Sequence, residues 1–239
     1  MKDFFDHVID LIVGGQSNIL LYGYGSKIKL IYEFVNHFQT TFNFPNNFKN
    51  FTNINDTLRK YSYSEYDILV INCFNSDITL RFILNEIEEL LFKKYDEIGK
   101  NIRKEYKKTS CKNIYDQLKF FEEFFSEFID KYNNNSRILL TLVNIDNVQF
   151  MNNYSQNFLS QIAKISGIQV ICTIDNLNTD FYWTQTIKEN FQFYFLNVNT
   201  YVNYDLEINE NYNLTDFSNI KGGEGLKEVI FSLNNNQRY

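Results

Sequence analysis

The fold of this chain is decided by the stretch Asn18-Ile-Leu-Leu-Tyr-Gly-Tyr-Gly-Ser-Lys27. The apolar run before Gly23 predicts a buried strand, because short apolar segments bounded by glycine are typical of strands in a covered sheet. Residues 28–38 then place apolar side chains at helical spacing. A glycine-rich turn between strand and helix is where nucleotide-binding α/β domains hold a phosphate, because backbone N–H groups and the helix dipole converge there.

The turn itself departs from a working phosphate loop. A P-loop reads GxxxxGK[ST], with enough backbone to surround the β-phosphate and a hydroxyl after the lysine to bind Mg²⁺. Here three residues separate Gly23 from Lys27, and Ile28 stands where the hydroxyl is needed. The residues of this loop, Gly23, Gly25, Ser26 and Lys27, therefore predict a degenerate P-loop without nucleotide. The alternative is an active P-loop NTPase with a shortened loop.

Two later segments stand where a nucleotide-binding site has its Walker B and sensor residues. Asp146 and Asn147 end a predicted strand at the place of Walker B, where an aspartate holds Mg²⁺ and the next glutamate polarises water. Asn147 cannot act as that base, and Asp146 is then a relic or a local structural residue, such as a turn residue or helix cap. Asp175 and Asn176 end the next strand, at the place of a polar sensor. An aspartate there would repel a triphosphate, although either residue could instead cap the following turn.

The alternation of strands and helices indicates an α/β fold. Apolar runs predict five strands: the first begins at residue 18, and the others cover 67–74, 137–145, 168–174 and 191–198. Periodic segments predict helices between them. Five such alternations predict a three-layer, doubly wound parallel sheet of five strands. We expect one α/β domain over residues 1–205. Residues 206–239 form a separate C-terminal segment that contains an amphipathic helix from Gly225 to Leu233.

Composition limits the partners and ligands. The chain carries 23 Lys+Arg and 29 Asp+Glu, a net charge of -6, whereas a domain that binds DNA through a basic surface normally carries positive charge. Any contact with nucleic acid must therefore come from a local patch or from other subunits.

The three cysteines show no CxxC pairing, which predicts a reducing compartment and no zinc site. No apolar run is long enough for a membrane span, and we expect no metal or cofactor.

Three motifs in the same order resemble the origin recognition complex subunit 2 family. The stretch from Asn18 to Lys27 resembles its N-[IL]-[LV]-L-Y-G-x-G-S-K segment. Residues 69–74 resemble its V-[IV]-N-G-[FY]-F strand, with Cys73 where the family usually has glycine. Residues 171–178, with Trp183 shortly after, resemble its [IL]-x-[AS]-[IST]-[IV]-D-x-L-N-x-x-x-x-W segment. Together these motifs extend over most of the chain, so they are more specific than any one alone.

The resemblance implies a degenerate AAA+/RecA-like domain with strand order 5-1-4-3-2. It implies a non-catalytic subunit of a nuclear complex that binds replication origin DNA and supports helicase loading. The implied partners are the other subunits, above all the subunit 3 homologue, together with origin DNA and helicase loading factors. Residues 206–239 would then be a lid remnant or linker, and the end at Tyr239 leads us to expect no winged-helix domain. The remaining alternative is an interaction scaffold of an unrelated complex.

Two segments do not follow the regular pattern. Residues 40–66 have poor periodicity and are expected to be a surface insertion with a short helix near Asp56 to Tyr61. Residues 93–112 are expected to be a basic loop or helix, since 93–108 hold seven Lys/Arg against three Asp/Glu. A solvated helix face or disordered loop would explain this charge, and so would contact with phosphate. The candidate DNA contacts are Lys100, Arg103, Lys104, Lys107 and Lys108.

Overall fold

The structure of the chain is a computed structural model that describes residues 2–14, 17–42, 58–62, 66–75, 77–94, 113–132, 137–176, 183–205 and 207. The described strands are β1 (Asn18–Tyr22), β2 (Leu58–Ser62), β3 (Tyr66–Asn72), β4 (Arg137–Val143), β5 (Ile168–Ile174) and β6 (Phe193–Asn197). The described helices are α1 (Lys2–Gly14), α2 (Ile28–Thr41), α3 (Leu80–Lys94), α5 (Ile114–Tyr132), α6 (Asn153–Lys164) and α7 (Gln185–Phe191).

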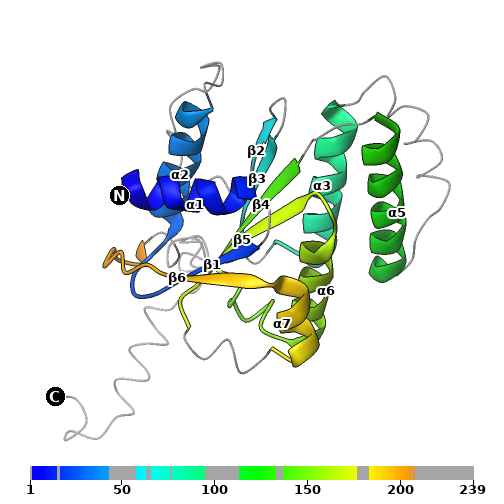
Figure 1. Cartoon of the computed structure of the whole chain (residues 1–239). Helices are drawn as coiled ribbons and strands as arrows, with labels where there is room; N and C mark the ends of the chain where they lie inside the picture. Colours follow the sequence, from blue (N-terminus) through cyan, green and yellow to red (C-terminus); the bar gives the residue numbers. More distant parts are fainter. Residues whose placement is uncertain are drawn as a thin grey trace, which may run out of the picture.

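The strands form one sheet in the order β2-β3-β4-β5-β1-β6 (Figure 1). All pairs from β3 to β6 are parallel, and their order is the one expected from the family resemblance. The predicted doubly wound α/β fold is therefore confirmed. The predicted bounds of β5 agree with the structure, and no end of β3, β4 or β6 differs from its prediction by more than two residues. The predicted strand 191–198 begins too early because residue 191 is the last residue of the unpredicted helix α7.

One prediction for the insertion is wrong. Residues 58–62, where we expected a short helix, form the antiparallel edge strand β2, with Leu58 opposite Ile71 and Ser62 opposite Asp67. The reason is tertiary: the outer edge of β3 presents backbone N–H and C=O groups that need partners, and an adjacent segment that folds back supplies them. The rest of the insertion that separates α2 from β2, residues 43–57, lies outside the described residues.

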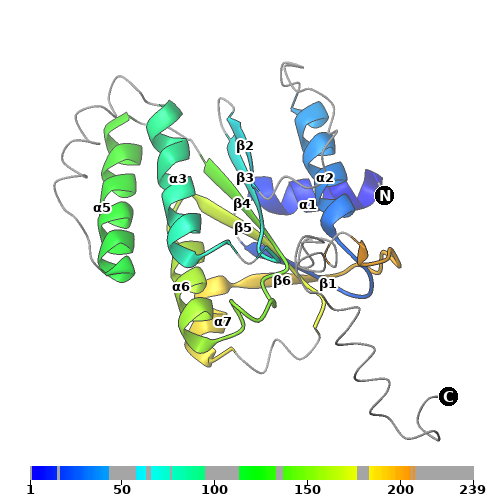
Figure 2. The same ribbon diagram turned by 180° about the vertical axis from the view of Figure 1, so that it is seen from behind.

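Each face of the sheet is covered by its own hydrophobic cluster. Leu69, Leu140 and Cys172 point to the face covered by α3, α6 and α7, whereas their neighbours Leu139 and Ile171 point to the face covered by α1 and α2. The two views in Figures 1 and 2 show these helices on opposite sides of the sheet. Side chains alternate because successive Cβ atoms of a strand point to opposite faces. Strands covered on both sides are apolar throughout, as their sequences indicate.

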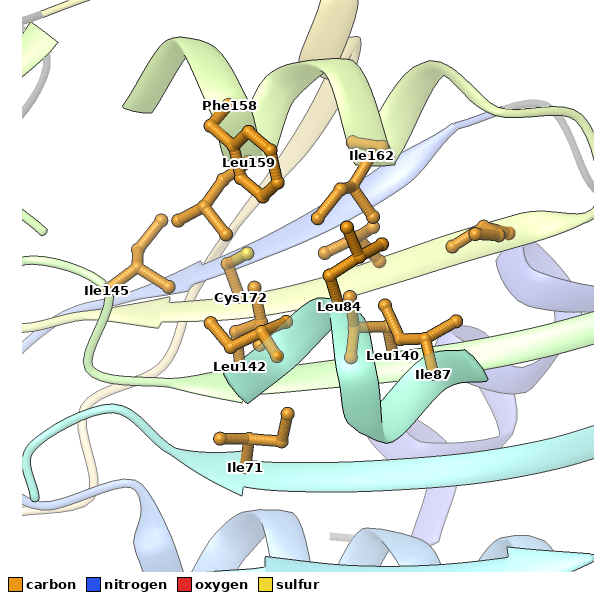
Figure 3. Packing of buried hydrophobic residues seen from close by; sticks show 14 of the residues in the cluster. Ile71, Leu84, Ile87, Leu140, Leu142, Ile145, Phe158, Leu159, Ile162 and Cys172 are labelled. Atoms are coloured by element: carbon orange, nitrogen blue, oxygen red, sulfur yellow. The ribbon is translucent and has the colours of Figure 1, made fainter. Parts of the chain in front are cut away.

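The cluster under α3 and α6 is drawn in Figure 3. Leu84 and Ile87 of α3 lie over the strands beside Phe158 and Ile162 of α6, and Cys172 of β5 lies below them. Outside this layer, α5 stands beside α3 (Figure 1). Gln117 of α5 donates to Asn85 Oδ1 and to Glu88 Oε1 of α3, both at 2.9 Å. Trp183, which follows the third motif, is buried, and its indole nitrogen donates to Gln156 Oε1 at 2.8 Å.

Asn18 ties the first strand to three other elements. Its Nδ2 donates to the carbonyl oxygens of Phe191 at 2.7 Å and Ala163 at 3.2 Å, and its Oδ1 accepts from Val170 N at 2.7 Å. These partners lie at the end of α7, near the end of α6 and in β5. One buried amide therefore satisfies three backbone groups that have to pack where α6 and α7 meet the start of β1.

We predict that Asn18→Ala lowers the free energy of unfolding by about 2 to 4 kcal/mol, because it leaves buried backbone groups without partners. Urea denaturation of the two proteins measures the difference. The matched control is Asn197→Ala, since Asn197 is the same residue type, exposed in the neighbouring strand β6, and should change stability by less than about 0.5 kcal/mol. Equal effects of the two substitutions would contradict the role of Asn18.

Candidate functional site

The predicted site residues of the glycine turn, the Walker B position and the sensor position meet at one edge of the sheet. The turn Gly23–Lys27 joins β1 to α2, Asp146 and Asn147 follow β4, and Asp175 and Asn176 follow β5. Strands β4, β5 and β1 are neighbours in the sheet. Ligands of open α/β sheets bind beyond the carboxyl ends of such strands, so this edge is the place where a nucleotide would lie.

Lys27 points into its own loop. Its side chain is completely buried, and Nζ donates to Gly23 O at 2.7 Å and to Gly25 O at 3.1 Å. It also forms an ion pair with Asp175 Oδ1. The three hydrogen-bonding positions of the ammonium are thus occupied by oxygens of the chain itself. A lysine that binds a nucleotide must instead direct its charge at the β- and γ-phosphates.

Asp175 links this loop to β4. Its Oδ2 accepts from Asn144 Nδ2 at 3.1 Å, and Asn144 is buried with a positive φ of 58°. Burial raises the pKa of the Asp175 carboxyl above its ordinary value, although the hydrogen bond and charge of Lys27 lower it. The carboxylates of Asp146 and Glu207 raise the pKa of Asp175 further. Negative charge therefore gathers where a triphosphate would need positive charge.

Residues 198–204, which we call the closing segment, cover the loop. Three consecutive loop amides donate to it: Tyr24 N to Asn199 Oδ1 at 2.8 Å, Gly25 N to the hydroxyl of Tyr204 at 3.0 Å, and Ser26 N to Val202 O at 3.0 Å. Backbone N–H groups of this kind are the donors that hold phosphate in an active loop. Here they are satisfied by the chain.

The closing segment also donates to the loop. Thr200 N donates to Tyr24 O at 2.9 Å, and Thr200 Oγ1 donates to Ser26 O at 2.9 Å. Burial and nearby carboxylates raise the pKa of the Tyr204 hydroxyl, while its bond with Gly25 N lowers it. Tyr204 is therefore a neutral phenol at ordinary pH, able to accept from Gly25. Hydrogen bonds thus run in both directions between the two segments, so the contact is a formed interface.

The two glycines make this approach possible. Gly23 has a φ of +136° and Gly25 a φ of +94°, which L residues with side chains rarely adopt. A Cβ at Gly23 would lie 2.6 Å from Val198 O, and one at Gly25 would lie 2.5 Å from Thr200 Oγ1. The absence of a side chain at these two positions thus lets the closing segment approach the loop.

The remaining predicted residues bind backbone. Asp146 Oδ2 accepts from Asp175 N at 2.8 Å and from Asn176 N at 2.6 Å, so its carboxylate fixes the turn after β5. Asn147 Nδ2 donates to Cys73 O and Phe74 O, both at 3.0 Å, and so ties the end of β4 to the end of β3. Both side chains hold strand ends together, which is the structural alternative that the sequence left open for Asp146.

Several expected features fall outside this site. The candidate DNA contacts Lys100, Arg103, Lys104, Lys107 and Lys108 and the helix expected over 225–233 lie outside the described residues. Among the residues that are described, no group of three or more His, Cys, Asp or Glu side chains could hold a metal ion. Within that same part of the chain, no helix has the length and apolarity required to cross a bilayer.

The sequence did not reveal the closing segment or Asn144. No local pattern in 198–204 indicates contact with a loop more than 170 positions earlier, because that contact depends on the parallel pairing of β6 with β1. Val198 N continues this pairing by donating to Tyr22 O at 2.7 Å. Given the predicted strand order, the adjacency of β6 and β1 was the available signal: the residues after β6 must pass beside the residues after β1.

Comparison with known proteins decides the family. A family profile described as the origin recognition complex subunit 2 RecA-like domain matches residues 4–198. This chain belongs to the origin recognition complex subunit 2 family. The family predicted from the three motifs is thereby confirmed. Origin recognition complex subunit 2 of Drosophila melanogaster is 26% identical over 225 residues, which cover 92% of this chain and 29% of the fly protein. The subunit 2 protein of Oryza sativa subsp. indica is 21% identical over 193 residues, 79% of this chain and 43% of the rice protein.

Solved structures of Drosophila origin recognition complexes contain chains with the same fold. The Drosophila complex bound to AT-rich DNA and Cdc6 contains a chain that matches with a TM-score of 0.63 and 22% identity, over 99% of this chain and 64% of that one. The Drosophila complex bound to DNA contains a match with a TM-score of 0.60 and 22% identity, over 86% of this chain and 93% of that one. At this identity, the similarity shows the fold. The chain spans less than half the length of the curated subunit 2 relatives it matches.

We predict that Lys27→Ala lowers the free energy of unfolding by about 2 to 4 kcal/mol, because it leaves the partly buried Asp175 carboxylate without its charged partner. The control Lys29→Ala removes an exposed lysine two positions later and should cost less than about 0.5 kcal/mol. Urea denaturation measures both. The double variant Lys27→Met with Asp175→Asn should recover part of the loss, since neither buried charge remains unpaired. A Lys27→Ala protein as stable as the Lys29→Ala protein would contradict the inward role of Lys27.

Proposed function

We propose that this chain is the RecA-like part of an origin recognition complex subunit 2 that works without binding or hydrolysing a nucleotide. The observation that carries this proposal is the filled phosphate loop: its amides donate to the closing segment, and its lysine binds Gly23, Gly25 and Asp175. The missing hydroxyl at Ile28 and the missing glutamate at Asn147 support the same conclusion. The domain acts as a scaffold, and ATP chemistry belongs to other subunits.

The proposal includes the partners that the family implies. The similar Drosophila complexes are described as bound to DNA and to Cdc6, which supports origin DNA and other replication initiation proteins as partners of this chain. We include the other subunits of the complex, above all the subunit 3 homologue, and the factors that load the replicative helicase. The protein would act in the nucleus. Its part in binding DNA is shared with other subunits, because the chain alone carries a net charge of -6.

A nucleotide titration tests the non-catalytic part. We expect isothermal titration of the chain with ATP and Mg²⁺ to show no binding tighter than roughly 1 mM, which corresponds to about 4 kcal/mol. A P-loop ATPase with a complete GxxxxGK[ST] loop is the positive control. Magnesium-dependent binding at micromolar ATP, lost in the Lys27→Met variant while the protein stays folded, would instead favour an active NTPase with a shortened loop.

The basic segment can be tested in the assembled complex. We propose that Lys100, Arg103, Lys104, Lys107 and Lys108 contact DNA phosphates. Replacing all five with glutamine should weaken DNA binding and reduce the slope of log K against log salt by about 0.9 for each lost phosphate contact. The control replaces Lys29, Lys119 and Lys164, exposed lysines of α2, α5 and α6, with glutamine. An unchanged slope in the five-fold variant would assign the basic segment to a solvated surface.

A further inference from the structure

The closing segment places three oxygens against three consecutive amides of the glycine turn. The backbone N–H groups of residues 24–26 each donate to a different residue of that segment. The acceptors are Asn199 Oδ1 at 2.8 Å, the hydroxyl of Tyr204 at 3.0 Å and Val202 O at 3.0 Å. A terminal phosphate group also offers three oxygens, and amides between a strand and a helix are the donors that bind them. A phosphate would therefore compete with the closing segment for the same donors.

The three oxygens of the closing segment carry no charge. Asn199 offers an amide oxygen, Val202 a backbone carbonyl and Tyr204 a phenol, whose pKa is raised by burial. Hydrogen bonds to a charged acceptor are roughly twice as strong as bonds between neutral groups. A phosphate is thus the better acceptor for each amide, and the closing segment prevails because it is tethered beside the loop by the pairing of β6 with β1.

The loop also holds a donor that the closing segment leaves unused. Ser26 is 1% exposed, and within the described part of the chain its hydroxyl oxygen has no hydrogen-bond partner. Buried polar atoms normally have such a partner. Gly25, the preceding residue, has a φ of +94°, and successive N–H groups in a turn of this kind form a concave site for anions. The turn therefore retains more donors than its present contacts use.

The charges at this edge work against an anion in the unaltered chain. The Lys27 ammonium is paired with Asp175, and the carboxylates of Asp146 and Glu207 lie close enough to raise the pKa of Asp175. The single positive charge is thus compensated, and further negative charge lies nearby. Removal of the Asp175 charge would leave the Lys27 ammonium uncompensated beside the loop amides.

We propose that the closing segment is an internal substitute for phosphate, and that the glycine turn keeps a latent phosphate site that opens when Asn199 and Tyr204 are withdrawn. This proposal rests on the proposed function, because it takes the unaltered chain to bind no nucleotide. It adds that a contact within the fold excludes phosphate, beyond the groups that the loop lacks. A partner that draws residues 198–204 away from the loop would expose the same donors.

Two of the three acceptors are side-chain atoms, so substitution can remove them and keep the backbone bonds. Asn199→Ala combined with Tyr204→Ala, which we call the opened variant, leaves the amides of Tyr24 and Gly25 without acceptors in the closing segment. The full chain is titrated with inorganic pyrophosphate at constant ionic strength, and the NMR signals of these two amides report binding. We expect the opened variant to bind at least about tenfold more tightly than the unaltered chain, because charged oxygens replace neutral ones.

Unchanged affinity in a folded opened variant would overturn the proposal. The matched control is Tyr201→Ala combined with Asn203→Ala, which changes the same residue types in the same segment. Both control residues are exposed, and the control should bind pyrophosphate no better than the unaltered chain. An equal gain in the control would also overturn the proposal.

Two further variants extend the test. Addition of Asp175→Asn to the opened variant should tighten binding again, because it removes a carboxylate and leaves the Lys27 charge uncompensated. Weaker binding after this addition would contradict a site beside Lys27. If the opened variant loses its fold, Asn199→Ala and Tyr204→Phe are tested singly, since each frees one amide and should give part of the gain. No gain in either single variant would overturn the proposal.

The phosphate group could be free or carried by a nucleotide, and titration of the opened variant with ADP distinguishes these sources. Equal affinity for ADP and pyrophosphate assigns the site to the phosphates alone, whereas tighter binding of ADP adds a contact with the nucleoside; either result supports a phosphate site. Tight magnesium-dependent binding of ATP by the unaltered chain would overturn the proposed function. If neither the unaltered chain nor the opened variant binds a phosphate compound, this inference fails and the proposed function stands.

Discussion

The buried ammonium of Lys27 imposes the constraint from which the arrangement of this edge follows. A charge removed from water must be surrounded by oxygens, and the loop carbonyls of Gly23 and Gly25 and the Asp175 carboxylate supply them. Meeting that requirement draws the loop inward and joins the end of β1 to the end of β5. Asn144 then extends the connection to β4 through the second oxygen of Asp175. One lysine thus orders three strand ends.

This arrangement explains how an α/β domain keeps the outline of a nucleotide-binding fold without its ligand. The strand order, the glycine turn and the helix that follows it all remain. The groups that would hold phosphate have acquired partners within the chain, in the closing segment and at Asp175. The backbone amides of Tyr24, Gly25 and Ser26 and the Lys27 ammonium all have partners within the chain, so the loop holds its shape without a nucleotide. A subunit of this kind can offer a fixed surface to its neighbours regardless of nucleotide state.

The sequence predicted much of this fold because the parallel strands are buried on both faces. Their apolar runs are therefore continuous and easily recognised, as in residues 68–71 and 138–140. It failed at β2, where a short segment with mixed side chains became a strand by pairing with the edge of β3. It also missed α7, which is seven residues long and begins at the N-cap Thr184, whose side chain accepts from Ile187 N. β2 depends on its pairing with the neighbouring strand β3, and α7 on its packing against α6, more than on local preference.

For the candidate site, the sequence alone determined that two groups needed for nucleotide hydrolysis are missing, since Ile28 cannot provide the metal-binding hydroxyl and Asn147 cannot provide the base. Local chemistry suffices for that conclusion, because each role requires a particular functional group at a particular position. Only the tertiary structure decided what occupies the emptied loop. The direction of the Lys27 side chain and the approach of residues 198–204 depend on the pairing of β6 with β1 and on the meeting of three strand ends. These are relations between segments far apart in the chain, which no local pattern contains.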